Sequence, residues 1–197
     1  MLILNYYLEI MSATTSNINV YTEGTPNPAT MKFLVNKLLI NNAVDFATRE
    51  SAEKSQFAKE LYKFNFVTGV FFANNFVTIT KSDGAEWADI EPILKEFVKG
   101  AVESELKILE TEQVESSFEG TDIEIKIQQI LNDYVKPAVE QDGGAISYKS
   151  FNEGIVTVEL RGSCSGCPSS TITLKAGIEN LLKRMVPEVT EVVSEAL

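Results

Sequence analysis

The chain has two cysteines, Cys164 and Cys167, and both lie in one short motif between Gly162 and Pro168. Their two-residue spacing fits metal or cluster ligation, dithiol–disulfide chemistry, or two reduced cysteines with no special role. A strand is expected to end at Gly162 and a helix to begin at Pro168, since proline suits the first helical position. The cysteines then sit at a helix N-terminus, where unpaired N–H groups and the helix dipole favour thiolates and anionic metal–thiolate complexes.

The absence of histidine narrows the chemistry further. It removes histidine-activated nucleophiles, mixed cysteine and histidine zinc sites, and histidine-ligated iron. Iron–sulfur clusters and structural zinc commonly need four thiolates, and one chain supplies two. A symmetric homodimer builds a four-thiolate site from one repeated motif, and such an exposed site is suited to surrendering its metal. A thioredoxin-like fold is disfavoured, because only about 30 residues follow Cys167 and they supply one helix and one strand.

Composition and charge limit the partners. The chain has 197 residues, 44% of them hydrophobic, and 17 basic against 28 acidic residues give a net charge of −11. This charge repels phosphate backbones, so nucleic acid is not an expected partner. The apolar stretch 1–10 is too short to span a bilayer and lacks a basic region, and Met11 is an alternative start. We expect a soluble cytoplasmic protein with no membrane partner.

An acidic, polar stretch at 110–121 divides the chain into two halves that each show full secondary-structure patterns. We therefore predict an extension at 1–17, a first domain at 18–109, a linker at 110–121 and a second domain at 122–197. The predicted fold class is α+β, with two small mixed α/β domains joined by the linker.

In the first half, the pattern predicts two strands around the turn Thr25–Pro28, then a helix, a hairpin around Asn74 and Asn75, and a long helix. The turn is interpreted as rigid in preference to a contact site, and Trp87 as the core anchor of the long helix in preference to a binding aromatic. The expected strands are 18–21, 31–35, 70–72 and 76–80, the helices are 55–62 and 87–109, and the buried face of the long helix carries Ile90, Ile93, Leu94, Phe97 and Val98.

The second half is expected to fold in the order α-β-β-α-β. Asp122 is the predicted N-cap of its first helix, Pro137 a kink or a restart, and 142–144 a helix stop and turn in preference to a ligand loop. A hairpin follows around 152–154, and a second helix begins at Pro168. The expected helical stripes are Ile123, Ile127, Ile130, Leu131, Tyr134 and Ala138 in the first helix and Leu174, Ile178, Leu181 and Met185 in the second, with a last strand at 189–193.

Residues 122–197 resemble the NifU-like C-terminal domain. They carry its motifs in the expected order, namely DGG at 142–144, LRG at 160–162, CSGCP at 164–168 and TLKAGI at 173–178. The first half is similar to the N-terminal domain of Nfu-type proteins, with TPNP at 25–28, KF at 32–33, FVTGVF at 66–71 and VTIT at 77–80.

The resemblance implies an iron–sulfur cluster scaffold or carrier rather than an enzyme. It implies one [4Fe–4S] cluster shared per homodimer, with Cys164 and Cys167 as the ligands in each subunit and no catalytic residue. Its implied partners are apo iron–sulfur proteins as clients and upstream cluster assembly proteins, recognised through the first domain. The alternatives are a structural zinc–thiolate dimer and a dithiol redox protein.

Overall fold

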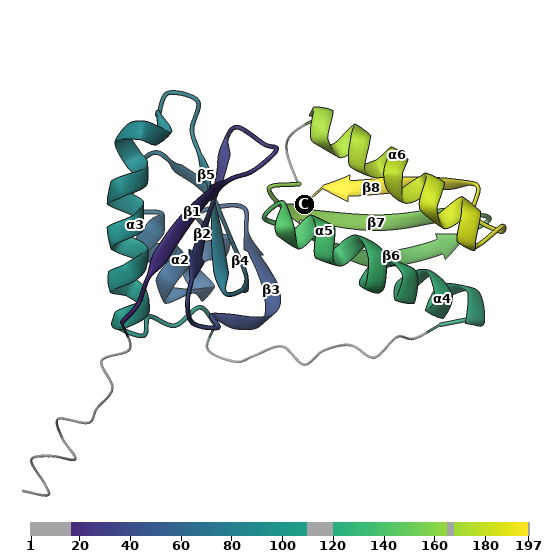
Figure 1. Cartoon of the computed structure of the whole chain (residues 1–197), viewed down its shortest axis with the longest axis horizontal. Coiled ribbons are helices and arrows are strands. Elements are labelled where there is room, and N and C mark those ends of the chain that lie inside the picture. The colour runs from purple at the N-terminus through teal and green to yellow at the C-terminus, as the bar shows by residue number, and fades with distance from the viewer. Residues whose placement is uncertain (1–16, 110–119, 165–167, 197) are drawn as a thin grey trace, which may run out of the picture.

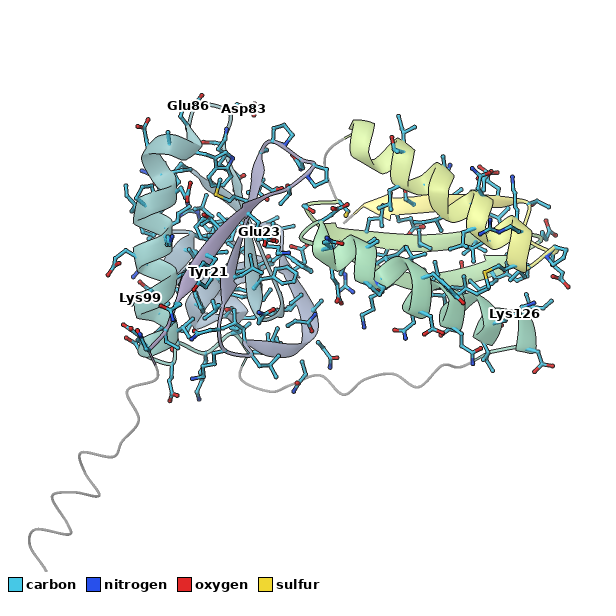
Figure 2. All side chains as sticks on the ribbon, viewed as in Figure 1. Tyr21, Glu23, Asp83, Glu86, Lys99 and Lys126 are labelled. Carbon is cyan, nitrogen blue, oxygen red and sulfur yellow. The ribbon has the colours of Figure 1, made fainter. Side chains whose placement is uncertain are left out.

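The computed structural model describes residues 17–109, 120–164 and 168–196 (Figure 1). These residues form two mixed α/β domains, each with its own sheet and its own buried apolar cluster, as the sequence predicts. Side chains fill the space between the helices and the sheet in each domain (Figure 2). The predicted linker lies almost wholly outside the described residues, and the predicted domain boundaries stay predictions.

The first domain is a five-stranded antiparallel sheet in the order β1-β2-β5-β4-β3, with helices on one face. The predicted turn at 25–28 joins β1 to β2, and a tight hairpin joins β4 to β5. The elements are β1 (Val20–Gly24), β2 (Thr30–Val35), β3 (Ile40–Phe46), η1 (Ser51–Lys54), α2 (Gln56–Leu61), β4 (Val67–Asn74), β5 (Phe76–Lys81) and α3 (Trp87–Glu103).

Three features of the first domain differ from the prediction. Strand β3 was not predicted, because it is an edge strand in which only Ile40 and Phe46 are buried, so it lacks a clear alternation. Helix α3 ends at Glu103 rather than at residue 109. Ile93, predicted to face the core, is 49% exposed. Trp87 does pack against the core and donates through Nε1 to the Pro28 carbonyl at 3.0 Å.

The second domain places three helices on one face of a three-stranded sheet in the order β6-β7-β8 (Figure 1). Strands β6 and β7 form the predicted hairpin, and β8 pairs with β7 in parallel after the crossover through α6. The elements are α4 (Asp122–Ile130), η2 (Leu131–Val135, a π turn), α5 (Lys136–Gln141), β6 (Gly144–Asn152), β7 (Ile155–Gly162), α6 (Pro168–Met185) and β8 (Glu191–Ala196).

The helix start and one apolar stripe need correction. Thr121, not Asp122, is the N-cap of α4: its side chain accepts from the Glu124 N–H while the Glu124 carboxylate accepts from the Thr121 N–H. Tyr134, predicted on the apolar face, is 61% exposed, because the π turn rotates the residues that follow Ile130. In α6, the most deeply buried side chain is that of Leu182, which was not on the predicted stripe.

Within the described ranges, no helix is both long and apolar enough to cross a membrane.

Candidate metal centre

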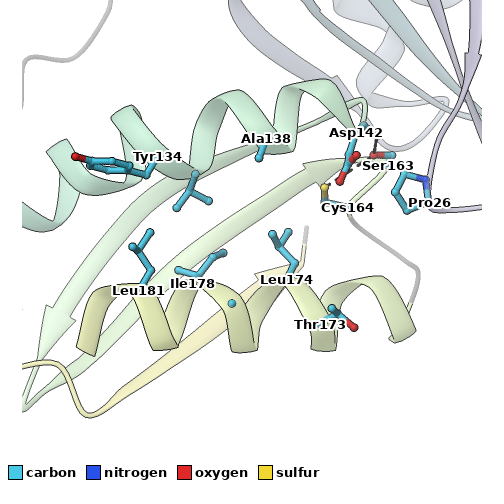
Figure 3. Close-up of a pocket in the computed structure, with 12 residues that line it drawn as sticks. Pro26, Tyr134, Ala138, Asp142, Ser163, Cys164, Thr173, Leu174, Ile178 and Leu181 are labelled. Atoms are coloured by element: carbon cyan, nitrogen blue, oxygen red, sulfur yellow. Dashed lines mark hydrogen bonds between the residues drawn. The ribbon is translucent and has the colours of Figure 1, made fainter. Parts of the chain in front are cut away.

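Cys164 lies just after β7, in the connection that leads to α6 (Figure 3). Its side chain is only 6% exposed and belongs to the apolar cluster of the second domain. Cys167, the other predicted ligand, lies outside the described residues. The structure therefore places one of the two predicted site residues, at the predicted junction between a strand and a helix.

A close contact with β6 holds the sulfur of Cys164. A Cβ atom built on Gly144 would lie 2.7 Å from Cys164 Sγ and 2.7 Å from the Arg161 carbonyl oxygen. Distances this short are not tolerated between non-bonded heavy atoms, so only glycine leaves room for the thiol at this position. Gly144 therefore does more than help to stop a helix, because it also makes room for the Cys164 thiol. This second role was not predicted from the sequence.

Ser163 ties the cysteine to the turn that follows α5. Its backbone N–H donates to the Gly143 carbonyl at 3.2 Å, and its hydroxyl donates to the Asp142 carbonyl. The same hydroxyl oxygen lies 3.9 Å from Cys164 Sγ. The backbone next to the thiol is therefore held by hydrogen bonds to a turn from a distant part of the sequence.

Burial raises the pKa of the Cys164 thiol above its ordinary value of 9.0. The Asp142 carboxylate adds to this increase, and the contact with Ser163 opposes it. At Cys164, burial therefore opposes the stabilisation of a thiolate that is expected at a helix N-terminus. A metal binds the thiolate form, so metal binding here releases the thiol proton.

An open pocket of about 690 Å³ runs from Cys164 between α6 on one side and η2 and α5 on the other (Figure 3). Its walls are mostly apolar, with Val135 and Ala138 on one side and Leu174 and Ile178 of α6 on the other. Asp142 and Ser163 lie beside the thiol at one end, and Pro26 of the first domain closes that end (Figure 3). The pocket gives Cys164 an apolar approach that is wide enough for a bulky group.

No group of three or more cysteine, aspartate or glutamate side chains that could hold a metal ion is found in the part of the chain that the structure describes. A site of four protein ligands around Cys164 therefore needs residues from outside the described ranges, from another chain, or both.

Two family models match the chain, one in each domain. Residues 20–105 match the "Scaffold protein Nfu/NifU N terminal" family, and residues 127–193 match the "NifU-like domain" family. Fold and motif together thus define a two-domain protein of the Nfu type.

Curated relatives agree with this class. One, from Drosophila sechellia, is named NFU1 iron-sulfur cluster scaffold homolog, mitochondrial; it is 36% identical over 94% of this chain and 68% of its own length. The human protein of the same name is 37% identical over 86% of this chain and 69% of its own length. The chain belongs to the NFU1 iron–sulfur cluster scaffold family. It spans about two thirds of the length of these relatives.

These relatives contradict the cytoplasmic expectation, because each is named mitochondrial. That expectation was wrong since it relied on the absence of a recognisable targeting segment, and such an absence does not identify a compartment. A solved NifU-like protein from Saccharomyces cerevisiae matches 48% of this chain and 87% of its own with 18% identity and a TM-score of 0.41, and no conclusion about this chain follows from it.

Proposed function

We propose that this chain is a mitochondrial carrier that binds a [4Fe–4S] cluster as cargo between two copies and transfers it to apo-proteins. Cys164 and Cys167 of each copy supply the four thiolates. The chain catalyses no reaction of its own. The compartment follows the names of the curated relatives, and the cargo follows the family to which the chain belongs.

The observation that carries this proposal is the count and placement of the thiols. The whole chain holds two cysteines and no histidine, and Cys164 lies at the end of an open apolar pocket. A cluster with cysteine ligation needs four thiolates, so one chain leaves half of the ligands to another molecule. A second copy is the simplest source, because a two-fold axis presents the same motif twice.

A cluster shared between two chains suits delivery. Its binding free energy is also the free energy that joins the two copies, so the loaded dimer and the cluster-free monomer are linked. A client that competes for the iron therefore dissociates the dimer as it takes the cluster. A site enclosed by one chain would lack this route.

The first test is anaerobic reconstitution with iron and sulfide, followed by iron, sulfide and zinc analysis and by mass in solution. We expect a dimer with about two irons and two sulfides per chain, as one four-iron cluster per dimer requires. Cys164→Ser and Cys167→Ser should each abolish loading. Ser150→Ala, at the far end of β6, is the control that should load like the wild type.

Zinc content separates the proposal from its main alternative. If the protein takes up no iron and holds about half a zinc ion per chain, the site is a structural zinc–thiolate site that joins the dimer. A variant that lacks Cys164 and still holds a full cluster would refute the ligand assignment.

Delivery itself is tested by mixing the loaded dimer with an apo-protein whose absorption spectrum depends on a [4Fe–4S] cluster. Transfer should stop when the loaded clusters are used up, at one acceptor per dimer, and the carrier should return to the monomer mass. Repeated turnover of the acceptor without reloading would show catalysis instead.

A further inference from the structure

The outer face of the first sheet, opposite its helices, is apolar and covered by the second domain. Phe71, Ala73 and Phe76 form a buried cluster there with Ala145 of β6. Successive residues of a strand face opposite sides, and Phe72 accordingly belongs to the core on the helical side. Without its cover, the outer face would be an exposed apolar patch of the kind that marks a binding surface.

Polar residues of the first sheet reach the turn that packs beside the cysteine. Thr78 donates through Oγ1 to the Gly143 carbonyl at 2.7 Å, and Lys32 donates through Nζ to the Gln141 carbonyl at 3.0 Å. Both donor side chains are buried although they are polar. Burying such groups costs free energy unless they are hydrogen-bonded, so these contacts make the docking specific. Lys32 also forms an ion pair with Glu23 of β1, with Nζ 3.1 Å from Oε2.

A third contact reaches the residue directly before the cysteine. Asn27, in the turn at 25–28, is buried and donates through Nδ2 to the Ser163 carbonyl at 3.3 Å. Pro26 of the same turn closes the end of the pocket that holds Cys164 (Figure 3). The turn, for which the sequence favoured a rigid turn over a contact site, therefore also contacts the residue before Cys164.

Two glycines of the second domain leave room for side chains of the first domain. A Cβ on Gly162 would lie 2.8 Å from the ring of Phe71, and a Cβ on Gly143 would lie 3.0 Å from Thr78 Oγ1. Both glycines also have positive φ, +67° and +82°, which side chains other than glycine rarely adopt. The two domains are therefore in close contact at Gly143 and at Gly162, two residues before Cys164.

Ten residues, 110–119, connect the described parts of the two domains, and a fully extended chain of that length spans at most about 33–36 Å. The two chain ends that this segment joins therefore stay within that distance of each other, whether the domains are docked or not.

From these contacts we propose that the outer face of the first sheet is a lid for the cysteine loop of the second domain. In the metal-free chain the lid holds Ser163, directly before Cys164, and the turn at 141–143 that packs beside it, and so keeps the thiol buried against its own domain. It leaves this surface when a second copy approaches to share the cluster. The inference rests on the proposed function only for this last step.

The reason is geometric. A cluster ligated by two chains requires both cysteine loops to present their sulfurs outward, and Cys164 is 6% exposed in the docked arrangement. The loop cannot turn outward while the Ser163 and Gly143 carbonyls are held by Asn27 and Thr78. Undocking frees both carbonyls together, because both donors belong to the first domain: Thr78 lies in β5, and Asn27 lies in the turn that leads into β2, the neighbour of β5.

The sharpest test is Ala145→Glu. Ala145 packs against the lid rather than in the core of its own domain, so a glutamate at this position opposes docking. When the domains are undocked, the glutamate lies in water beside its cross-strand neighbour Arg161. The matched control is Thr157→Glu, which adds the same carboxylate to the same sheet face further along β7 from the cysteine loop.

The main readout is alkylation of Cys164 in the full-length, metal-free Cys167→Ser chain, where a single thiol remains. We expect Ala145→Glu to raise the iodoacetamide rate at least about tenfold, as loss of a local closed state does, and Thr157→Glu to leave it unchanged. An unchanged or slower rate in Ala145→Glu would overturn the lid.

A second variant covers the case in which Ala145→Glu does not fold. Thr78→Val removes one docking hydrogen bond at nearly constant volume, and it should raise the alkylation rate in the same direction. If it too leaves the rate at the wild-type value, the inference fails.

Cluster uptake, measured with both cysteines present, separates this inference from the proposed function. Faster uptake by Ala145→Glu supports the lid, whereas slower uptake would mean that the first domain positions the loop instead. If the wild type takes up no cluster at all, the proposed function fails, and the alkylation experiment still decides whether the first domain covers the thiol.

Discussion

Substituting Gly144 by alanine tests the close contact between β6 and the cysteine. The new Cβ would lie 2.7 Å from Cys164 Sγ and from the Arg161 carbonyl, where ordinary van der Waals contact begins at 3.4 Å. The carbonyl is part of the β6–β7 ladder and moves only with its strand, so the sulfur and its loop have to shift.

The Gly144→Ala substitution should lower the free energy of unfolding. Overpacking by one methyl group costs about 1–3 kcal/mol, and the stiffer unfolded chain of the alanine variant offsets about 0.4–1 kcal/mol of it. A net loss of about 1–2 kcal/mol lowers the midpoint of thermal unfolding by about 2–8 °C for a chain of this size.

The assay is circular dichroism of the unfolding transition of the second domain, with Gly177→Ala as the matched control. Gly177 lies within α6, and no atom lies within 4 Å of the position that its Cβ would take, so alanine there should stabilise the helix by about 0.5–1 kcal/mol. The two identical substitutions thus have opposite expected signs. A Gly144→Ala midpoint equal to or above that of the wild type would refute the reasoning.

Three further predictions concern the described residues. Burial raises the pKa of Asp45 above its ordinary 3.8, so the folded state favours the protonated carboxyl and gains stability as the pH falls towards 4. Asp45→Asn should therefore raise the midpoint of thermal unfolding at pH 7 by about 2–4 °C, for about 1 kcal/mol, with a smaller gain at pH 4. A lower midpoint at pH 7 would contradict this. Thr121→Ala removes a capping box and should cost about 1 kcal/mol in urea unfolding, whereas an unchanged midpoint would place the helix start elsewhere. Because burial raises the pKa of Cys164 above 9.0, its alkylation in metal-free Cys167→Ser protein should still accelerate between pH 8.5 and about 9.5, and a plateau below pH 9 would show an activated thiolate instead.

The local pattern of the sequence predicted most of the elements, because helices and hairpins follow from apolar spacing and turn residues over short distances. The helix stop at 142–144 and the hairpin around residues 152–154 lie where the pattern indicates, and the last strand, predicted at 189–193, lies at Glu191–Ala196. The cysteine motif likewise follows the end of β7 as predicted.

Features that depend on contacts between distant residues were not predicted. Strand β3 is stabilised by pairing with β4 rather than by its own alternation. Phe71 and Phe72 face opposite sides of β4, which indicates a sheet that is buried on both faces. The neighbouring sequence does not show that the second domain covers the face that carries Phe71. Gly144 looks like a turn residue in the sequence, and only the fold brings the sulfur of Cys164 against it.

The order of strands along the chain has a consequence for protein synthesis. The first sheet is complete once α3 has emerged, whereas the central strand of the second sheet waits for β8, which follows the cysteines in sequence. Domains generally fold from the N-terminus as the chain emerges. The surface of the first domain that contacts Ser163 is therefore complete before Cys164 is made, and the Cys164 thiol is buried, and so less open to oxidation, as soon as its own domain folds.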